Sequence, residues 1–373
     1  MTVATAREEQ TRSARRRGFE RILIVRLGSM GDIVHTLPAV ATLRRAFPDS
    51  RIDWVVENRW SELLCSRAEL FDAPLSPEKP LADHVHVVDT RGWRKELTAA
   101  ATRQAAGSVV RALRQARYDV AIDLQGAVKS ALLMRLAGAR VRFGFSRPIE
   151  SPAGLVYTRR VAARGRHIAE QNVSLAVAAA ASVGIAAEPV YDFPLPRDSK
   201  FTAWARTELE QRRIRDFVMM TPGAGWGAKC WPSDRFGAVA RKLAEQEITT
   251  IVNYGPGEKD LADAVIAASA GAAQPLACTL SQLIAITRRA RLFIGGDTGP
   301  THLAAALGIP VVGIYGPTDP ARNGPMGAPM TVLRSERSVT SHARRKQAEA
   351  GLLEIAADRV SDAALKLLAG RAS

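Results

Sequence analysis

One stretch decides the fold that we expect: Arg291-Leu-Phe-Ile-Gly-Gly-Asp-Thr-Gly-Pro-Thr-His-Leu-Ala-Ala-Ala-Leu-Gly-Ile-Pro-Val-Val-Gly-Ile-Tyr-Gly316. The apolar run that ends at Ile294 predicts a buried strand. Pro300 suits the first turn of a helix that Gly308 would end, and Pro310–Tyr315 predicts a second strand. The stretch is therefore a strand–loop–helix–strand unit, the building block of an α/β domain with a parallel sheet.

The loop of this unit has the composition of an anion site. Its glycines let backbone amides approach a ligand at the positive end of the following helix, and nearby side chains add further donors. We predict that a diphosphate is held here by Gly296, Asp297, Thr298, Gly299, Thr301 and His302. A tight turn capped by Thr298 or Gly299 would explain the glycines alone, but it requires neither an Asp nor a His at the same helix mouth.

The length of 373 residues predicts two domains, each large enough to bury a core. We expect a flexible, arginine-rich tail over 1–20, a first domain over 21–188, a proline-marked linker over 189–200 and a second domain over 201–373. We leave open whether the C-terminal helix packs back on the first domain. The most apolar stretch, Val173–Ala187, is shorter than the ~20 residues that cross a bilayer, so no span is predicted.

The cysteines point to a reducing compartment. Cys65, Cys230 and Cys278 are scattered along the chain and lack the spacing of a metal site. This usage suits the cytoplasm and argues against a disulfide framework or a cysteine zinc site.

Positive charge is concentrated in one part of the chain. Residues 91–170 hold 16 Lys and Arg against 5 Asp and Glu, which leaves +11 of the total of +15. Such a segment is typical of a surface that faces an anionic lipid layer, a phosphorylated or carboxylated acceptor, or nucleic acid. The alternative is an arginine bias that only improves solubility.

The chain opens with a second strand–loop–helix unit. Arg21–Leu27 predicts a strand, a glycine loop follows, and apolar residues from Ile33 have helical spacing. The loop lacks the spacing of a dinucleotide fingerprint, and Asp32 at the helix start would repel a pyrophosphate. Asp32 is instead a carboxylate at the edge where ligands of such sheets bind, or the N-cap of the helix, or both.

More strands follow at Ile52–Glu57, Val85–Val88 and Val120–Asp123. The last of them runs into a loop that opens another helix. Because the carboxyl ends of parallel strands share one edge, we expect this loop to bring three polar residues close to Asp32: Gln125, Lys129 and Ser130. The loop would place a cation beside the carboxylate.

The second half begins with a predicted helix over Phe201–Arg213 and a strand over Phe217–Thr221. The loop that follows contains three glycines, two tryptophans and Lys229, and is predicted to bind phosphate through the lysine. Ser233 is expected to cap the next helix.

One more strand, Ile248–Tyr254, leads to Glu258, an acid that is suited to bind ribose or sugar hydroxyls. Glu258 and Lys229 thus join Asp297 and His302 at the strand ends of this half. Convergence of one polar contact from each loop is what a nucleotide-sugar site needs.

With these residues in view, the chain resembles the ADP-heptose:lipopolysaccharide heptosyltransferases, glycosyltransferase family 9, from about Arg21 to Arg334. Within the family it is most like the enzymes that attach the first heptose to Kdo of the inner core. The resemblance rests on five segments: Ser29–Pro38, Gln125–Ser130, Lys229–Pro232, Asp297–His302 and Tyr315–Pro320. The chain departs from the usual pattern at Pro300 and Cys230 and in its extra tail.

The resemblance implies an α/β fold of the GT-B kind, in which two Rossmann-like domains with parallel sheets face each other. The C-terminal domain would bind the donor and the N-terminal domain the acceptor. Asp32 then matches the general base, Lys229 the phosphate-neutralising lysine and Glu258 a donor-binding acid, while Asp297, Thr298, Gly299 and His302 match contacts to diphosphate and heptose. The candidate acceptor contacts are Gly31, Gln125, Lys129 and Ser130.

The implied reaction is an inverting transfer of heptose from ADP-heptose to Kdo-lipid A. The base removes the acceptor proton on one face of the sugar, and ADP departs stabilised on the other. The chain has no D-x-D motif, so we expect neither a metal nor another cofactor, with Lys229 and helix amides in the metal's place.

We expect a monomer at the cytoplasmic face of the inner membrane, associated peripherally with anionic lipid and without a nucleic-acid partner. The alternatives are a related transferase with another nucleotide sugar or acceptor, such as the enzyme that adds the second heptose, or a non-enzymatic module that binds anionic lipid or nucleic acid.

Overall fold

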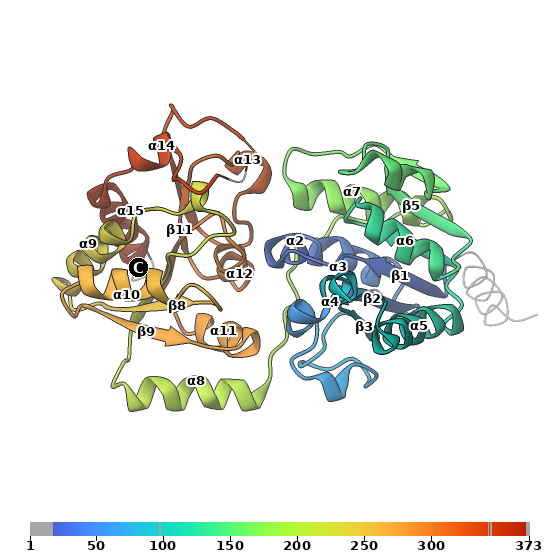
Figure 1. Ribbon diagram of the computed structural model, residues 1–373, viewed down its shortest axis with the longest axis horizontal. Coiled ribbons are helices and arrows are strands. Elements are labelled where there is room, and N and C mark those ends of the chain that lie inside the picture. The colour runs from blue at the N-terminus through green and yellow to red at the C-terminus, as the bar shows by residue number, and fades with distance from the viewer. Residues whose placement is uncertain (1–17, 97, 342, 344, 371–373) are drawn as a thin grey trace, which may run out of the picture. The chain divides into compact units, whose positions relative to one another are not determined.

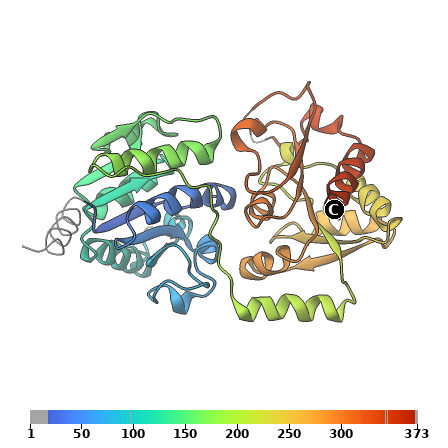
Figure 2. The same ribbon diagram turned by 180° about the vertical axis from the view of Figure 1, so that it is seen from behind.

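The computed structural model describes residues 18–370 except 97, 342 and 344, so most of the predicted tail lies outside the described residues. Contacts divide the chain into two units. The first comprises Met1–Ser29 and His35–Pro196, and the second comprises Met30–Val34 and Arg197–Ser373. Figures 1 and 2 show a sheet with surrounding helices in each unit.

The first unit contains a six-stranded parallel sheet in the order β3-β2-β1-β4-β5-β6. Its strands are β1 (Arg21–Val25), β2 (Arg51–Glu57), β3 (His84–Val88), β4 (Val120–Asp123), β5 (Val141–Phe145) and β6 (Arg159–Val161). Its α-helices are α3 (Leu37–Ala46), α4 (Thr90–Lys95), α5 (Ala100–Gln115), α6 (Val128–Leu136) and α7 (Ile168–Ala181), and its 3-10 turns are η1 (Asn58–Leu63), η2 (Ala68–Leu70) and η3 (Ser151–Leu155).

The second unit repeats this design with the sheet order β12-β11-β10-β7-β8-β9, again entirely parallel. Its strands are β7 (Phe217–Thr221), β8 (Thr249–Tyr254), β9 (Ala273–Ala277), β10 (Leu292–Gly296), β11 (Val311–Tyr315) and β12 (Met330–Arg334). Its helices are α2 (Met30–Val34), α8 (Ser199–Gln211), α9 (Ser233–Ala244), α10 (Lys259–Ala268), α11 (Leu280–Thr287), α12 (Gly299–Ala306), α13 (Pro320–Asn323), α14 (Ala350–Leu353) and α15 (Ala357–Ala369), with the 3-10 turn η4 (Gly227–Lys229).

Each sheet is covered on both faces because its central strands are apolar on both faces. In the first unit, Leu23 and Val25 of β1 pack with α5 and α6, while Ile22 and Ile24 point to the opposite face, and α3 packs on α7. In the second unit, α9, α10 and α15 cover one face of the sheet, and α12 contacts β10 and β11.

The core strands confirm the predictions most closely, since Val120–Asp123 and Phe217–Thr221 are observed with the expected bounds. Two predicted caps are wrong. Helix α2 begins at Met30, so Asp32 is its third residue and not an N-cap. Helix α9 begins at Ser233 itself, with Pro232 in the capping position.

The end of the chain packs within its own unit. Helix α15 lies against α9 and contacts β10, β11 and β12. Its apolar residues Val360, Ala364 and Leu368 belong to the core of that unit. The apolar side of the C-terminal helix is therefore buried on the second sheet.

A buried ionic network ties the middle of the first sheet together. Asp53 of β2 is fully buried and accepts hydrogen bonds from Arg51 (2.9 Å) and from the Tyr118 hydroxyl (2.7 Å). Because the Tyr118 proton goes to Asp53, His86 Nε2 donates to the Tyr118 oxygen at 2.7 Å. Burial alone would raise the pKa of Asp53, but the interactions of its carboxylate with His86, Arg51 and Tyr118 outweigh burial, and the pKa is lowered.

We predict that Asp53→Ala lowers the free energy of unfolding by about 3 kcal/mol at neutral pH, because it leaves buried donors without an acceptor. Urea denaturation measures the effect, and Asp192→Ala, which removes an exposed carboxylate, is the control. Since the folded-state pKa of Asp53 is lowered, its contribution is present above its unfolded pKa of about 4 and is lost as the pH falls. Equal stability of both variants at pH 7 would contradict the prediction.

Candidate active site

Several of the predicted donor-binding residues lie where the strand order of the second sheet reverses, between β7 and β10. Strands β7 and β10 are neighbours, but the chain continues from β7 to β8 and from β10 to β11, which lie in opposite directions along the sheet. Open α/β sheets bind ligands at such a point. Lys229 lies in the loop after β7, and Asp297 follows β10 directly. Both reach the same edge because the strands are parallel.

Asp297 is the centre of this cluster. Its carboxylate forms an ion pair with the Lys229 ammonium and accepts a hydrogen bond from His302 Nε2 at 3.1 Å. Burial alone would raise the pKa of Asp297, but the His302 hydrogen bond and the charge of Lys229 outweigh it, and the pKa lies far below its ordinary value. Asp297 therefore stays ionised and fixes two cationic or donor groups around it.

Lys229 is held from a second side by Trp226, whose ring centroid lies 4.2 Å from the Lys229 nitrogen. The contact is a cation–π interaction, which restrains the ammonium further. The backbone of the same loop crosses the strand end closely, since a Cβ on Gly296 would lie 3.2 Å from the Lys229 carbonyl. The sequence analysis noted the two tryptophans of this loop but did not predict that one of them contacts Lys229.

The turn between Asp297 and α12 is closed by its own hydroxyls. Pro300 occupies the first turn of α12, as predicted. Thr301 is fully buried and donates to the Gly296 carbonyl at 2.7 Å, so the Thr298 hydroxyl donates to Thr301 at 3.2 Å. Thr298 is at the N-cap position, but its side chain makes no capping bond. The alternative of a turn capped by the Thr298 side chain is thus wrong, and in this structure Thr301 closes the turn.

Glu258 lies in the same unit beside the loop after β7. Its carboxylate accepts from the Gly255 amide at 2.9 Å. A Cβ on Gly223 would come within 2.2 Å of the Glu258 carboxyl group, so that glycine is what lets the loops after β7 and β8 approach each other. The loops after β7 and β8 therefore meet, whereas binding of ribose or sugar hydroxyls by Glu258 stays a prediction.

One element of this site was not predicted from the sequence. We call it the strap, and it consists of residues 335–341, 343 and 345–349. Within it, the Arg345 carbonyl accepts from the Ala228 amide at 3.0 Å, and the Glu349 amide donates to the Ala228 carbonyl at 3.2 Å. A Cβ on Gly227 would lie 1.7 Å from the Lys346 carbonyl. The strap therefore holds both sides of the short turn that carries Lys229.

Two side chains fasten the strap. The Glu349 carboxylate accepts from the Ser338 hydroxyl at 3.0 Å and from the Leu352 amide at 2.9 Å. Arg334, at the end of β12, donates to the Ser338 carbonyl and to the Thr340 hydroxyl. The contacts of the strap with Ala228 join residues more than 100 positions apart and have no periodic signal, which is why the sequence could not reveal them.

In the first unit, the loop after β4 is organised by Asp123. This fully buried carboxylate accepts from the amides of Gln125 (2.9 Å) and Gly126 (3.1 Å) and from the hydroxyls of Ser130 (2.9 Å) and Tyr157 (2.8 Å). Burial dominates and raises the pKa of Asp123, because all four partners are neutral. Asp123 is a structural anchor that the sequence reading did not single out.

The predicted acceptor residues take different roles. Ser130 is fully buried inside this loop, so in this structure it anchors the backbone. The Gln125 side chain accepts from the Leu27 amide at 2.8 Å and joins the ends of β4 and β1. Lys129 remains half-exposed and lies 3.6 Å from Glu57, a buried acid that also accepts from Thr90.

Asp32 and Gly31 lie on α2, which groups with the second unit through its contacts with α12. A Cβ on Gly31 would come 2.6 Å from His302 Cδ2, so only a glycine fits there. Asp32 is partly buried in the first turn of α2. The structure thus brings the helix of Asp32 to the helix of His302.

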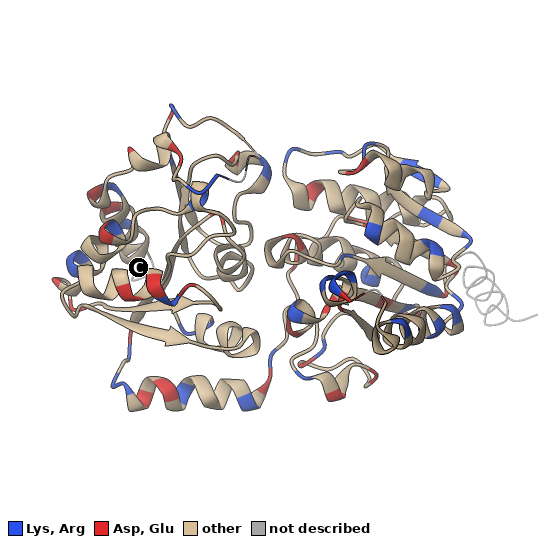
Figure 3. Ribbon diagram, viewed as in Figure 1, with Lys and Arg blue, Asp and Glu red and all other residues tan. Residues whose placement is uncertain are grey.

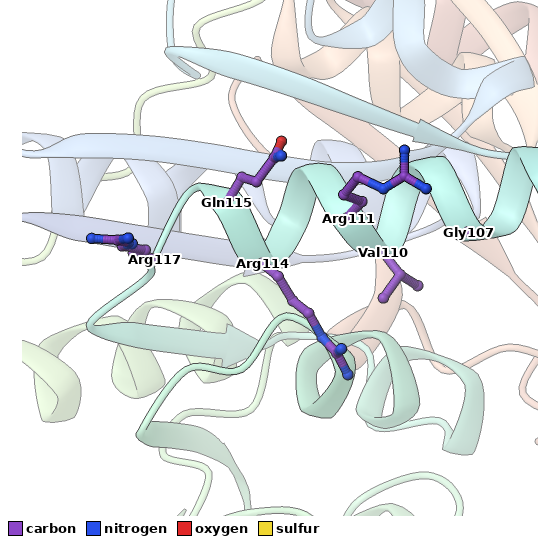
Figure 4. Close-up of a pocket in the computed structure, with 6 residues that line it drawn as sticks. All are labelled: Gly107, Val110, Arg111, Arg114, Gln115 and Arg117. Carbon is purple, nitrogen blue, oxygen red and sulfur yellow. The ribbon is translucent and has the colours of Figure 1, made fainter.

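A separate pocket of about 450 Å³ lies on the first unit. It is lined by Gly107, Val110, Arg111, Arg114, Gln115 and Arg117, which belong to α5 or follow it (Figure 4). Arg114 uses its Nε to bind the Leu136 carbonyl at 3.0 Å. None of the predicted site residues line this pocket.

Comparison with known proteins shows the family. Residues 106–353 match the sequence profile of glycosyltransferase family 9 (heptosyltransferase). The chain belongs to this family. Family 9 membership identifies the protein as a glycosyltransferase, and it is consistent with a site built from cations and helix amides at the strand ends.

Named relatives cover most of this family 9 glycosyltransferase. The chain is 29% identical over 321 residues to lipopolysaccharide heptosyltransferase 1 of Pseudomonas aeruginosa, covering 85% of this chain and 84% of that protein. It is also 29% identical over 321 residues to lipopolysaccharide heptosyltransferase 1 of Escherichia coli K12, covering 85% and 94%. The solved structure of E. coli heptosyltransferase WaaC with ADP matches with a TM-score of 0.73 and 25% identity, covering 93% of this chain and 99% of that one.

Within the described residues, no group of three or more His, Cys, Asp or Glu side chains is arranged to hold a metal ion. In the same part of the chain, no helix has the length and apolar character needed to cross a membrane.

We predict that Gly227→Ala lowers the free energy of unfolding by about 1–3 kcal/mol, because the added methyl group must displace the strap or the turn that carries Lys229. Hydrogen exchange at the amides of Ala228 and Glu349 should become faster. Gly225→Ala in the same loop is the matched control, since a Cβ there meets open space. Unchanged exchange at both amides in Gly227→Ala would show that the strap does not restrain the turn.

Proposed function

We propose that this family 9 glycosyltransferase transfers heptose from ADP-heptose to a Kdo residue of the lipopolysaccharide inner core, with a GT-B arrangement and inversion at the transferred carbon. The observation that carries the proposal is the trio of Lys229, Asp297 and His302 beside the N-terminus of α12. Relatives named lipopolysaccharide heptosyltransferase 1 and the solved heptosyltransferase with ADP support the choice of donor and acceptor.

The donor diphosphate would bind at the N-terminus of α12, where unpaired amides and the helix dipole favour negative charge. Lys229 would neutralise the leaving group. Its ammonium is already held by Asp297 and Trp226, so little reorganisation is needed when charge develops on ADP. Glu258 would bind the ribose or sugar hydroxyls, and Gly296, Thr298, Gly299 and His302 would line the diphosphate and heptose.

The acceptor would meet Asp32, which removes the proton of the attacking hydroxyl. Position supports this role, since α2 contacts α12 and so approaches the predicted donor site. Lys129 is the predicted acceptor contact that stays half-exposed, and Gly31 and Gln125 complete that set with the buried Ser130. We further propose a monomer at the cytoplasmic face of the inner membrane, needing no metal or other cofactor.

The decisive experiment measures release of ADP from ADP-heptose on addition of Kdo-bearing lipid A, with and without excess EDTA. We expect turnover in both conditions. An acceptor that already carries the first heptose distinguishes transfer of the first heptose from transfer of the second. Preference for that acceptor would favour transfer of the second heptose. Loss of turnover in EDTA that Mg²⁺ restores would overturn the proposed metal-free reaction, and absence of ADP release with every acceptor would overturn the function.

We predict that Asp32→Asn lowers kcat by about 10²–10⁴-fold and changes the Kd for ADP little, because a general base acts on the acceptor proton only. Steady-state kinetics and calorimetric titration with ADP make the two measurements. Asp260→Asn, at an exposed acid of α10, is the control. A near-normal kcat in Asp32→Asn would remove Asp32 from the chemistry.

We predict that Lys229→Ala weakens ADP binding and lowers kcat together, because the same ammonium would meet the diphosphate before and during its departure. The exposed Lys259, which pairs with Asp263, gives the control variant Lys259→Ala. If Lys229→Ala kept its ADP affinity, the lysine would serve only to hold Asp297.

A further inference from the structure

The first unit exposes four large apolar side chains in one neighbourhood. Their exposed fractions are 45% for Val128, 54% for Leu132, 76% for Ile149 and 83% for Leu155. We call this group the α6/η3 patch, after the elements that carry or flank it. Single exposed apolar residues are ordinary, but a cluster marks an interaction site.

The four side chains lie close together because η3 packs against α6. Val128 and Leu132 are one helical turn apart and share a face of α6. The Glu150 carboxylate accepts from the Val128 amide at 2.7 Å, which brings Ile149 to the start of the helix. Leu155 ends η3, directly after Ala153 and Gly154, which are buried.

A basic rim surrounds these apolar side chains. Arg135 of α6 and Arg147 before η3 are exposed, and their side chains make no hydrogen bond or ion pair with the described residues. The exposed acid Glu150 lies beside them, with its carboxylate bonded to the Val128 amide, so the rim keeps a net positive charge. Other arginines of the same region are used internally: Arg142 binds the carbonyls of Val156 and Ala139, and Arg160 binds that of Gly154. Figure 3 shows Lys and Arg residues along α6 and the nearby β5.

We propose that the α6/η3 patch is the surface by which this protein docks on an anionic phospholipid layer. The apolar side chains would enter the boundary between headgroups and acyl chains, and the two rim arginines would bind lipid phosphates. The inference rests on the proposed function in one respect: docking would bring the enzyme to an acceptor that is carried by a lipid. Lys129, the half-exposed candidate acceptor contact, lies on α6 between Val128 and Leu132.

The charge of the rim indicates which partner binds the α6/η3 patch. In a symmetric pair of chains, the same patch would face itself and place arginines against arginines, which repel. An anionic leaflet attracts both rim arginines at once. The apolar centre adds a contribution that salt does not screen, unlike the purely electrostatic attachment expected from the basic segment 91–166.

The experiment uses flotation of the full-length protein with vesicles of phosphatidylglycerol and phosphatidylethanolamine, and with neutral phosphatidylcholine vesicles. Wild type should bind the anionic vesicles and keep part of this binding at roughly 1 M salt, where the Debye length is about 3 Å. Leu132→Ser with Leu155→Ser should lower the partition coefficient by roughly tenfold or more. Its matched control is Val339→Ser with Leu353→Ser, two exposed apolar residues of the second unit.

Charge is tested in the same way. Arg135→Ser with Arg147→Ser should reduce binding at low salt, while Arg111→Ser with Arg289→Ser, which removes two exposed arginines elsewhere, should not. Equal loss in test and control pairs would overturn the proposal in favour of diffuse attraction. Absence of wild-type vesicle binding would also overturn it, and so would reduced self-association of the leucine variant with unchanged vesicle binding, which would identify a second copy as the occupant.

Failure of this proposal is distinguishable from failure of the proposed function. Turnover of ADP-heptose with a deacylated, soluble Kdo acceptor should be unchanged in the leucine pair, because that acceptor needs no membrane. If wild type turns over no acceptor but the vesicle results hold, the patch stands and the proposed reaction is wrong. Loss of soluble turnover in the leucine pair alone would show that the patch belongs to the active site instead.

Discussion

The site depends on one constraint of parallel sheets, namely that neighbouring strands deliver their following loops to the same edge. Both sheets follow the same order, so β1 and β4 in the first unit correspond to β7 and β10 in the second. At each reversal, the sheet itself brings together two loops that are far apart in sequence. Lys229 and Asp297 pair across 68 positions of sequence for this reason.

The two reversals show how partners decide the role of a buried acid. Asp123 ends β4 and Asp297 follows β10, so they occupy related places in the two sheets. Asp123 has neutral donors, and burial raises its pKa. Asp297 is also buried, yet Lys229 and His302 lower its pKa strongly. The first acid anchors a loop through neutral donors, whereas the second stays ionised and positions Lys229 and His302 where we propose that the diphosphate binds.

The sequence predicted the strands whose residues are apolar on both faces and the polar residues that directly follow them. It did not predict β5, β6, β9 or β12. Of these, β6 and β9 at the sheet edges read Arg-Arg-Val and Ala-Gln-Pro-Leu-Ala and carry little apolar signal. The strap over Gly227 and the pairing of Glu57 with Lys129 were also missed. Both depend on contacts between distant segments, for which composition and periodicity give no information.

The basic segment shows why net charge alone is a poor guide to a partner. Several of its arginines, including Arg114, Arg142 and Arg160, donate to backbone carbonyls and so help to hold the fold. Such a guanidinium keeps its charge, but its hydrogen bonds to the backbone hold it in one orientation, so it cannot turn toward a ligand. The arginines that can follow a ligand are those without internal partners, and two of them, Arg135 and Arg147, flank the exposed apolar side chains of α6 and η3. A surface that combines mobile cations with apolar side chains selects an interface that is itself both anionic and apolar, which neither a nucleic acid nor a soluble sugar phosphate provides.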